Sequence, residues 1–178
     1  VAQNFGSNNF EEVFFSLLRP LIIAFTIGII LFLFKNYLYD LSIYFLTPNE
    51  QVQEFYKEYL FVRMIGLPAG LLNIVFLGWF FGMQKTKSVM LQLITINIVN
   101  IIASFYLAVF LDYGIFGVAL GSVIAQCSGL ILSIIILMCY YYKFNFRSYR
   151  LSKILNMGSF LKLFSISRHL FLRTMLLV

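Results

Sequence analysis

The sequence of 178 residues is poor in charged side chains, which make up 11% of it, and rich in hydrophobic side chains, which make up 61%. Soluble domains carry roughly a quarter charged residues. This shortage of charge excludes an ordinary soluble domain. We infer an integral membrane protein, with the lipid bilayer as its surroundings.

Groups suited to catalysis or metal binding are also scarce. His169 is the only histidine, and no acid lies near it in the sequence; we interpret it as a residue at the membrane boundary. The two cysteines, Cys127 and Cys139, lie in one hydrophobic run without disulfide or zinc spacing. No acid interrupts a hydrophobic core, and no Walker-type glycine loop is present. We therefore expect no enzyme, no metal site and no bound cofactor.

Basic residues outnumber acidic ones by 13 to 7, a balance that in some proteins indicates nucleic-acid binding. A nucleic-acid footprint needs basic residues clustered on a folded face. Here they lie at the ends of apolar runs, where membrane orientation and headgroup contact account for them. We expect no nucleic-acid partner.

Four apolar runs are long enough to cross a bilayer, which takes about 20 residues of helix. They predict an all-α, polytopic membrane helix bundle. A shorter apolar piece, Leu41 to Leu46, either lies at the interface or prolongs the first helix. The predicted membrane helices are residues 17–39, 59–83, 88–111 and 115–142.

The two ends of the chain differ from this pattern. Residues 1–16 are polar, and their acidic pair, Glu11 and Glu12, belongs either to the first turn of a helix or to a solvated loop. Residues 143–168 form a basic linker without acids, and residues 169–178 begin a further apolar run. The absent initiator methionine leads us to expect a piece of a longer polytopic protein or a truncated reading frame.

The charges of the loops predict the orientation. Residues 84–87 and 143–168 hold only basic charges, whereas residues 40–58 and 112–114 hold acids and a single lysine. Cytoplasmic loops of membrane proteins are enriched in lysine and arginine. We therefore predict that residues 1–16, 84–87 and 143–168 lie in the cytoplasm, and that the protein crosses the inner (plasma) membrane several times.

Polar residues interrupt the third run at helical spacing. Asn97, Asn100 and Ser104 are three and four residues apart, which places them on one face of a helix. Amides and hydroxyls are costly beside lipid. We expect this face to meet the protein interior or a wet cavity.

A second stripe runs along the second membrane helix, through Tyr59, Arg63, Gly66, Gly70 and Asn73. Small residues at such spacing let helices approach closely, so the stripe either lines a pathway or only permits tight packing. The same two interpretations apply to the last predicted helix, which pairs a small-residue face (Gly117, Gly121, Ala125) with a mildly polar one (Ser122, Gln126, Gly129, Ser133).

These residues also carry a family resemblance. YLFVRMIGLPAGLLNIVFLGWFFGM, QKTKSVMLQLITINIVNIIASF and DYGIFGVALGSVIAQCSGLILSI together resemble the multidrug and toxic compound extrusion (MATE) family, in its DNA-damage-inducible F (DinF) branch. The combination is specific: an Arg, a G-x-P, an L-G-W-F-x-G-x-Q before a basic turn, an N-x-x-N, and a G-x-x-G-x-A-L.

The resemblance implies a window from the end of helix two to the start of helix seven of a twelve-helix antiporter. Residues 1–142 would be part of the amino-terminal lobe, and residues 143–168 the linker to the second lobe. Such antiporters export cationic or amphipathic compounds in exchange for H⁺ or Na⁺ by alternating access. The remaining helices of the same transporter would be partners of this chain.

The resemblance also implies site residues. Asn100 matches an amide of the ion-coupling cluster, Ser122 a frequent threonine, and Tyr59 a tyrosine of the cavity. Ser104 stands where an acid is expected, and a hydroxyl cannot exchange a proton or sodium ion as a carboxylate does. The expected substrate or ion cavity is lined by Tyr59, Asn73, Asn97, Asn100, Ser104, Ser122 and Gln126.

Two alternatives share the same sequence features. A related flippase of lipid-linked substrates would have the same helix count and a polar lobe interior. A remnant of a decayed or split transporter frame would insert into the membrane without transporting.

Overall fold

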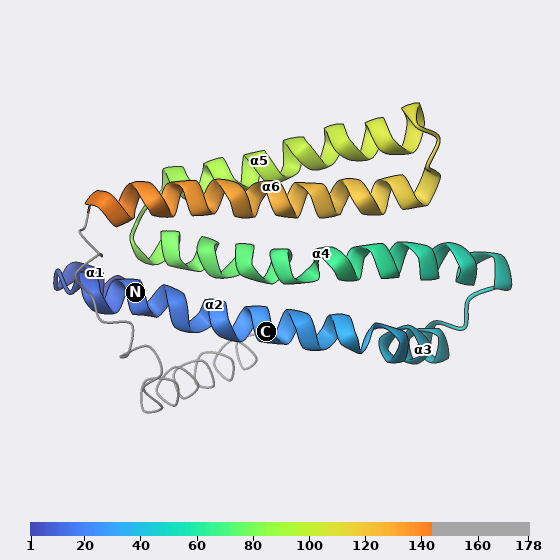
Figure 1. Cartoon of the computed structure of the whole chain (residues 1–178), viewed down its shortest axis with the longest axis horizontal. Coiled ribbons are helices and arrows are strands. Elements are labelled where there is room, and N and C mark those ends of the chain that lie inside the picture. Colours follow the sequence, from blue (N-terminus) through green and yellow to red (C-terminus); the bar gives the residue numbers. More distant parts are fainter. Residues whose placement is uncertain (144–178) are drawn as a thin grey trace, which may run out of the picture.

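The computed structural model describes residues 1–143, which form helices joined by short turns (Figure 1). Four segments are long and apolar enough to cross a membrane, which confirms the all-α, polytopic bundle. Most of the predicted basic linker, the predicted start of a further helix and His169 lie outside the described residues. The helices are α1 (Ala2–Gly6), α2 (Phe10–Leu33), α3 (Lys35–Leu46), α4 (Glu50–Gly82), α5 (Thr86–Phe105), the π-helix η1 (Tyr106–Phe110) and α6 (Gly114–Lys143).

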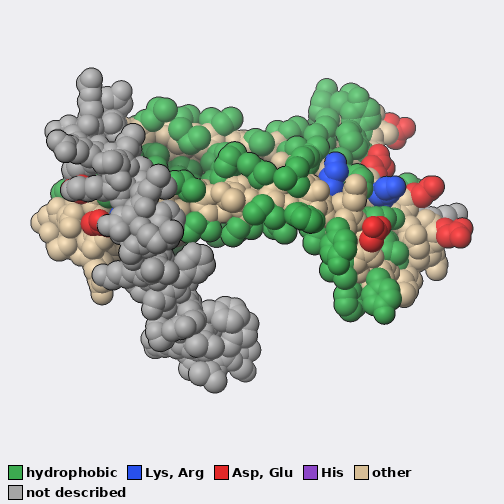
Figure 2. Space-filling view, turned by 60° about the horizontal axis from the view of Figure 1, so that its bottom comes forward, with side chains coloured by type: hydrophobic (Ala, Val, Ile, Leu, Met, Phe, Trp, Pro, Cys, Tyr) green, Lys and Arg blue, Asp and Glu red, His purple; other side chains and the backbone are tan. Residues whose placement is uncertain are grey.

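The long helices lie side by side in the order α5, α6, α4, α2 (Figure 1). Their alternating directions place α1, the α4–α5 turn and the end of α6 at one end of the bundle, and α3 with the α5–α6 turn at the other. Figure 2 shows a broad band of hydrophobic side chains between these ends. The predicted orientation requires residues 1–16 and 84–87 to lie at the same end of the bundle, and they do.

The first long helix begins at Phe10 rather than at residue 17, so residues 10–16 are helical and not a loop. The Asn9 side chain caps it by accepting a hydrogen bond from the Glu12 backbone N–H, at 3.2 Å. Val13 is fully buried, and its carbonyl accepts a 2.8 Å hydrogen bond from the Trp79 indole N–H of α4. The early start is stabilised because these first turns pack against α4.

The prediction of a single helix over residues 17–39 is wrong, because the helix is interrupted at Phe34. Beyond it lies α3, which Figure 1 shows nearly along its axis and which contains the short apolar piece, Leu41 to Leu46. The Lys35 ammonium lies 5.1 Å from the ring centroid of Phe61 on α4, and Tyr39 stacks on Tyr56 at 6.1 Å. The break gives α3 these aromatic contacts, which a straight continuation of α2 would forgo.

Two further boundaries differ from the predicted ones. α4 begins at Glu50 rather than at residue 59, so its acidic first turns are helical. α5 ends at Phe105 and continues as η1, where residues up to 111 were expected in one α-helix. A Cβ added at Gly117 of α6 would lie 2.7 Å from the Leu107 carbonyl carbon, so α6 packs directly on the wider π turn.

Glycines let the helices touch backbone to backbone. A Cβ at Gly28 of α2 would lie 2.8 Å from the Pro68 Cα of α4, and one at Gly121 of α6 would lie 2.5 Å from the Ser104 backbone nitrogen of α5. The predicted close packing at Gly121 is therefore confirmed. Gly78 of α4, by contrast, has nothing within 4 Å of the point that a Cβ would occupy.

We predict that Gly28→Ala destabilises the bundle by about 1–3 kcal/mol, because the added methyl must push α2 away from Pro68. Gly78→Ala is the matched control and should change stability by about 0.5 kcal/mol or less. Unfolding by dodecyl sulfate in micelles, followed by the fluorescence of Trp79, measures both. Equal effects of the two substitutions would contradict the proposed contact.

Candidate functional site

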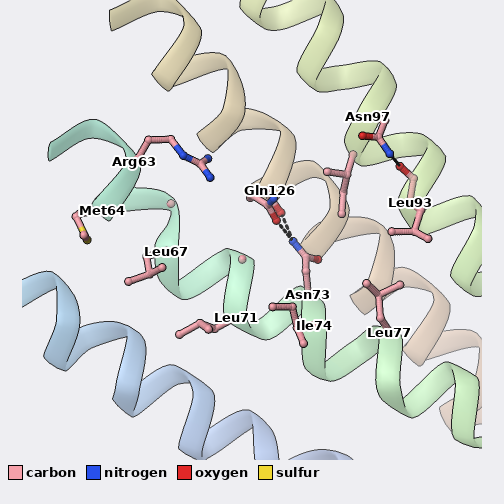
Figure 3. Close-up of a pocket in the computed structure, with 13 residues that line it drawn as sticks. Arg63, Met64, Leu67, Leu71, Asn73, Ile74, Leu77, Leu93, Asn97 and Gln126 are labelled. Atoms are coloured by element: carbon pink, nitrogen blue, oxygen red, sulfur yellow. Dashed lines mark hydrogen bonds between the residues drawn. The ribbon is translucent and has the colours of Figure 1, made fainter. Parts of the chain in front are cut away.

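A cavity of about 420 Å³ lies between α4, α5 and α6 (Figure 3). Its walls are mostly apolar, and four polar side chains interrupt them: Arg63, Asn73, Asn97 and Gln126. Three of these, all but Arg63, belong to the expected cavity residues. The apolar wall consists of Met64, Leu67, Leu71, Ile74, Leu77, Leu93 and Ile96, with Gly66 and Gly70 between them.

The stripe seen on the second predicted membrane helix divides here. Arg63, Gly66, Gly70 and Asn73 all line the cavity. Tyr59 does not, and packs instead with a separate apolar cluster of Val62, Ala119 and Val123. The stripe therefore serves both interpretations: it lines the cavity from Arg63 to Asn73 and packs against α6 at Tyr59 and Gly66.

Asn73 is the centre of a hydrogen-bond network that joins three helices. Its Nδ2 donates to the backbone carbonyl of Gln126 at 2.8 Å and to the Gln126 Oε1 at 2.9 Å, as Figure 3 shows. Its Oδ1 accepts from Gln92 Nε2 at 3.0 Å, and its own carbonyl accepts from the same nitrogen at 3.2 Å. We call Asn73, Gln92 and Gln126 the amide network.

Gln92 is a member that sequence reasoning missed. It is fully buried, and its Oε1 has no hydrogen-bond partner among the described residues. Its position in the sequence gave a signal, since it is an amide within a charge-free apolar run. The stripe of Asn97 and Asn100 drew attention to a different face of the helix.

In the part of the chain that the structure describes, Arg63 is the only charged side chain that lines this cavity. Within residues 1–143 its guanidinium has neither a hydrogen bond nor an ion pair, whereas Arg19 is bonded to Glu12 at 3.1 Å. In Figure 3 the Arg63 side chain extends from α4 toward Gln126. The sequence placed Arg63 on the stripe but did not identify it as a site residue.

The remaining expected residues lie along the contact between α5 and α6. Asn100 Nδ2 donates to Ser122 Oγ at 3.0 Å, and Ser122 Oγ in turn donates to the Val118 carbonyl at 3.2 Å. Ser104 Oγ lies 3.4 Å from the same carbonyl. Asn97, by contrast, is exposed and donates to Leu93 of its own helix at 2.8 Å. The polar stripe of α5 thus serves the helix contact with Asn100 and Ser104 and the cavity with Asn97.

The chemistry of the cavity is that of non-covalent binding. The described residues contain no group of three histidine, cysteine or acidic side chains that could hold a metal ion. What the cavity offers is one guanidinium, several amides and an apolar wall. Such sites bind a ligand by burying its apolar surface and orienting its polar groups.

We predict that Asn73→Ala destabilises the protein by about 1–2 kcal/mol, because the half-buried Gln126 amide oxygen and backbone carbonyl lose their donor and the buried Gln92 keeps only its bond to the backbone carbonyl of residue 73. Asn97→Ala is the matched control and should cost about 0.5 kcal/mol or less, since Asn97 bonds only to its own helix. Dodecyl sulfate unfolding measures both. A loss at Asn97 as large as that at Asn73 would contradict the central place of the amide network.

Comparison with known proteins agrees with this architecture. The family model MatE matches residues 1–106. DNA damage-inducible protein F of Escherichia coli (strain K12) is 30% identical over 176 residues, 99% of this chain and 38% of the relative. Protein DETOXIFICATION 43 of Arabidopsis thaliana is 32% identical over 79 residues, 44% of this chain and 15% of the relative. No solved structure matches.

The matched residues cover more than half of the chain, and the similarity to the Escherichia coli protein runs along nearly all of it. The chain spans little more than a third of that relative's length. Members of the matched family are transporters and not enzymes, in agreement with the absence of an enzyme expected from the sequence. This multi-pass membrane protein belongs to the MATE family and corresponds to a DinF-like segment of it.

Proposed function

We propose that this chain forms part of a membrane transporter that exports small amphipathic compounds in exchange for H⁺ or Na⁺ by alternating access. The observation that carries the proposal is the cavity between α4, α5 and α6, with one guanidinium and three amides in an apolar wall. A lipid-facing seam would not need such groups, because polar side chains are costly there. Polar groups near the middle of crossing helices are typical of substrate pathways.

The contact between α5 and α6 is the proposed position of ion coupling. Asn100, Ser122 and the Val118 carbonyl form a continuous hydrogen-bonded chain there, and Ser104 adjoins it. Cationic substrates, and the acid that a coupling ion needs, would take their counter-charge from helices outside this chain. The described part of the cavity contains no acid.

The proposed location is the inner (plasma) membrane, with residues 1–16, 84–87 and 143–168 in the cytoplasm. The basic composition of two of these segments supports this orientation. The antiparallel packing of the long helices, which puts residues 1–16 and 84–87 at the same end of the bundle, is consistent with it.

Transport is tested by flux in vesicles. We expect membranes that contain this chain together with the helices that complete a transporter to export a fluorescent amphiphile, with a dependence on the H⁺ or Na⁺ gradient that empty membranes lack. The chain alone is the control, because it holds one wall of a pathway. Complete assemblies without flux would favour a remnant that inserts but does not transport, and selective movement of lipid-linked substrates would favour a flippase.

Ion coupling is tested at Ser104. Ser104→Asp supplies the carboxylate that the family pattern places here, so we expect the gradient dependence of flux in the complete transporter to increase severalfold. Ser104→Asn is the control, since it adds a side chain of the same size without charge beside Gly121. Coupling that is unchanged in Ser104→Asp, or changed equally in both variants, would refute the assignment of this position to the ion site.

A further inference from the structure

An arginine side chain inside a membrane protein is costly unless its charge is paired or hydrated. Arg19 meets this requirement, because its guanidinium is bonded to Glu12 at 3.1 Å. Arg63 has no such partner within residues 1–143, although it is partly buried and faces the cavity. An unpaired guanidinium that lines a cavity is a binding group for an anion.

The amide network adds a second donor on the same side of the cavity. The Gln126 Oε1 accepts from Asn73 Nδ2 at 2.9 Å, and this bond fixes which end of the Gln126 amide faces Asn73. The Gln126 Nε2 therefore has its two N–H groups left over, since none of the hydrogen bonds in the described part of the chain uses them. A ligand group at this position must accept hydrogen bonds.

The balance of unused groups favours negative charge. Arg63 contributes up to five N–H donors and Gln126 two, and against these the exposed Asn97 offers the acceptor Oδ1, because its Nδ2 is bonded to Leu93. Among residues 1–143, no carboxylate lines the cavity. A cation placed here would meet the guanidinium, whereas an oxyanion would meet donors.

The rest of the wall determines what carries the oxyanion. Leu67, Leu71, Ile74, Leu77 and Leu93 continue the cavity along α4 and α5. The volume of about 420 Å³ falls within the range of small-molecule sites. The cavity thus joins a polar end at Arg63 and Gln126 to an apolar trough.

We propose that this cavity binds the oxyanion group, a carboxylate or phosphate, of an amphipathic ligand, with the Arg63 guanidinium as counter-charge and the Gln126 amide as second donor. The apolar part of the ligand lies along the leucines and isoleucine of α4 and α5. As a statement about the transported substrate, this inference rests on the proposed function. As a statement about binding, it rests on the cavity alone.

The test uses the full chain in phosphatidylcholine nanodiscs and a dansylated undecanoic acid as probe. Energy transfer from the single tryptophan, Trp79 on the same helix, reports bound probe after subtraction of empty nanodiscs. We expect Arg63→Gln to weaken binding of the acid by about tenfold or more, because a charge-assisted hydrogen bond is lost. Arg63→Lys, which keeps the charge but not the planar fork, should retain part of the affinity.

Lys57→Gln is the matched control. It removes the same charge from the same helix, but the Lys57 ammonium lies over the rings of Tyr39 and Phe61, 5.7 Å and 5.9 Å from their centroids, and not in the cavity. We expect it to leave binding unchanged. Equal weakening in Lys57→Gln and Arg63→Gln would mean that overall charge attracts the probe, and would overturn the proposal.

A second measurement needs no variant and decides the question if Arg63→Gln fails to fold. The methyl ester of the probe has the same apolar body without charge, and we expect it to bind about tenfold more weakly than the acid. An ester that binds as well as the acid would overturn the proposal. Competition by dihexanoyl phosphatidic acid but not by inorganic phosphate identifies a lipid headgroup as the source of the oxyanion, and the reverse result identifies a soluble anion; either result supports an oxyanion site.

The same experiments separate this inference from the proposed function. Arg63-dependent binding without flux in the complete transporter would refute transport and leave the oxyanion site standing. Flux that persists unchanged in Arg63→Gln, together with unchanged binding, would refute the oxyanion site and leave transport standing. If the complete transporter shows flux and its Arg63 forms a salt bridge with an acid of the remaining helices, the guanidinium belongs to an internal ion pair. That result would also overturn the oxyanion site.

Discussion

The amide network centred on Asn73 is the interaction on which the arrangement of the membrane helices depends. In a bilayer, helices gain little from hydrophobic burial against one another, so packing and interhelical hydrogen bonds hold them together. Asn73 bonds to Gln126 of α6 and to Gln92 of α5, and thereby fixes three helices at one level. The cavity begins beside this network, which makes Asn73 and Gln126 both structural supports and part of the binding wall.

Close backbone contact is the second means by which the helices associate, and different glycines make it between different helices. Gly28 places α2 against Pro68, and Gly121 places α6 against Ser104. With the helices packed in this way, the polar side chains of α5 have two different surroundings, the α6 helix and the cavity. Asn100 meets α6 through Ser122, whereas Asn97 remains beside the cavity. One polar face of a helix can therefore contribute to a helix contact and to a binding site at once.

The sequence was sufficient for the number of membrane-spanning helices and the family, because a long apolar run without charge and a motif are local properties. Of the cavity wall it gave three polar side chains, Asn73, Asn97 and Gln126. It could not reveal the break at Phe34 or the π turn after Phe105, since both arise from contacts with other helices. It also missed Gln92, whose role depends on which helix lies opposite. Arg63 was visible as one member of a stripe, but that it has no counter-charge among the described helices is a property of their assembly.

The contact between Gly28 and Pro68 has a mechanical consequence. Proline has no N–H, so the carbonyl one turn earlier in α4, at Met64, lacks its helical hydrogen bond. α4 is therefore least stiff at the level where α2 rests on it, between Arg63 and Asn73. Arg63 and Asn73 lie on the two segments of α4 that meet at this level, so a small bend there changes the separation between the guanidinium and the amides.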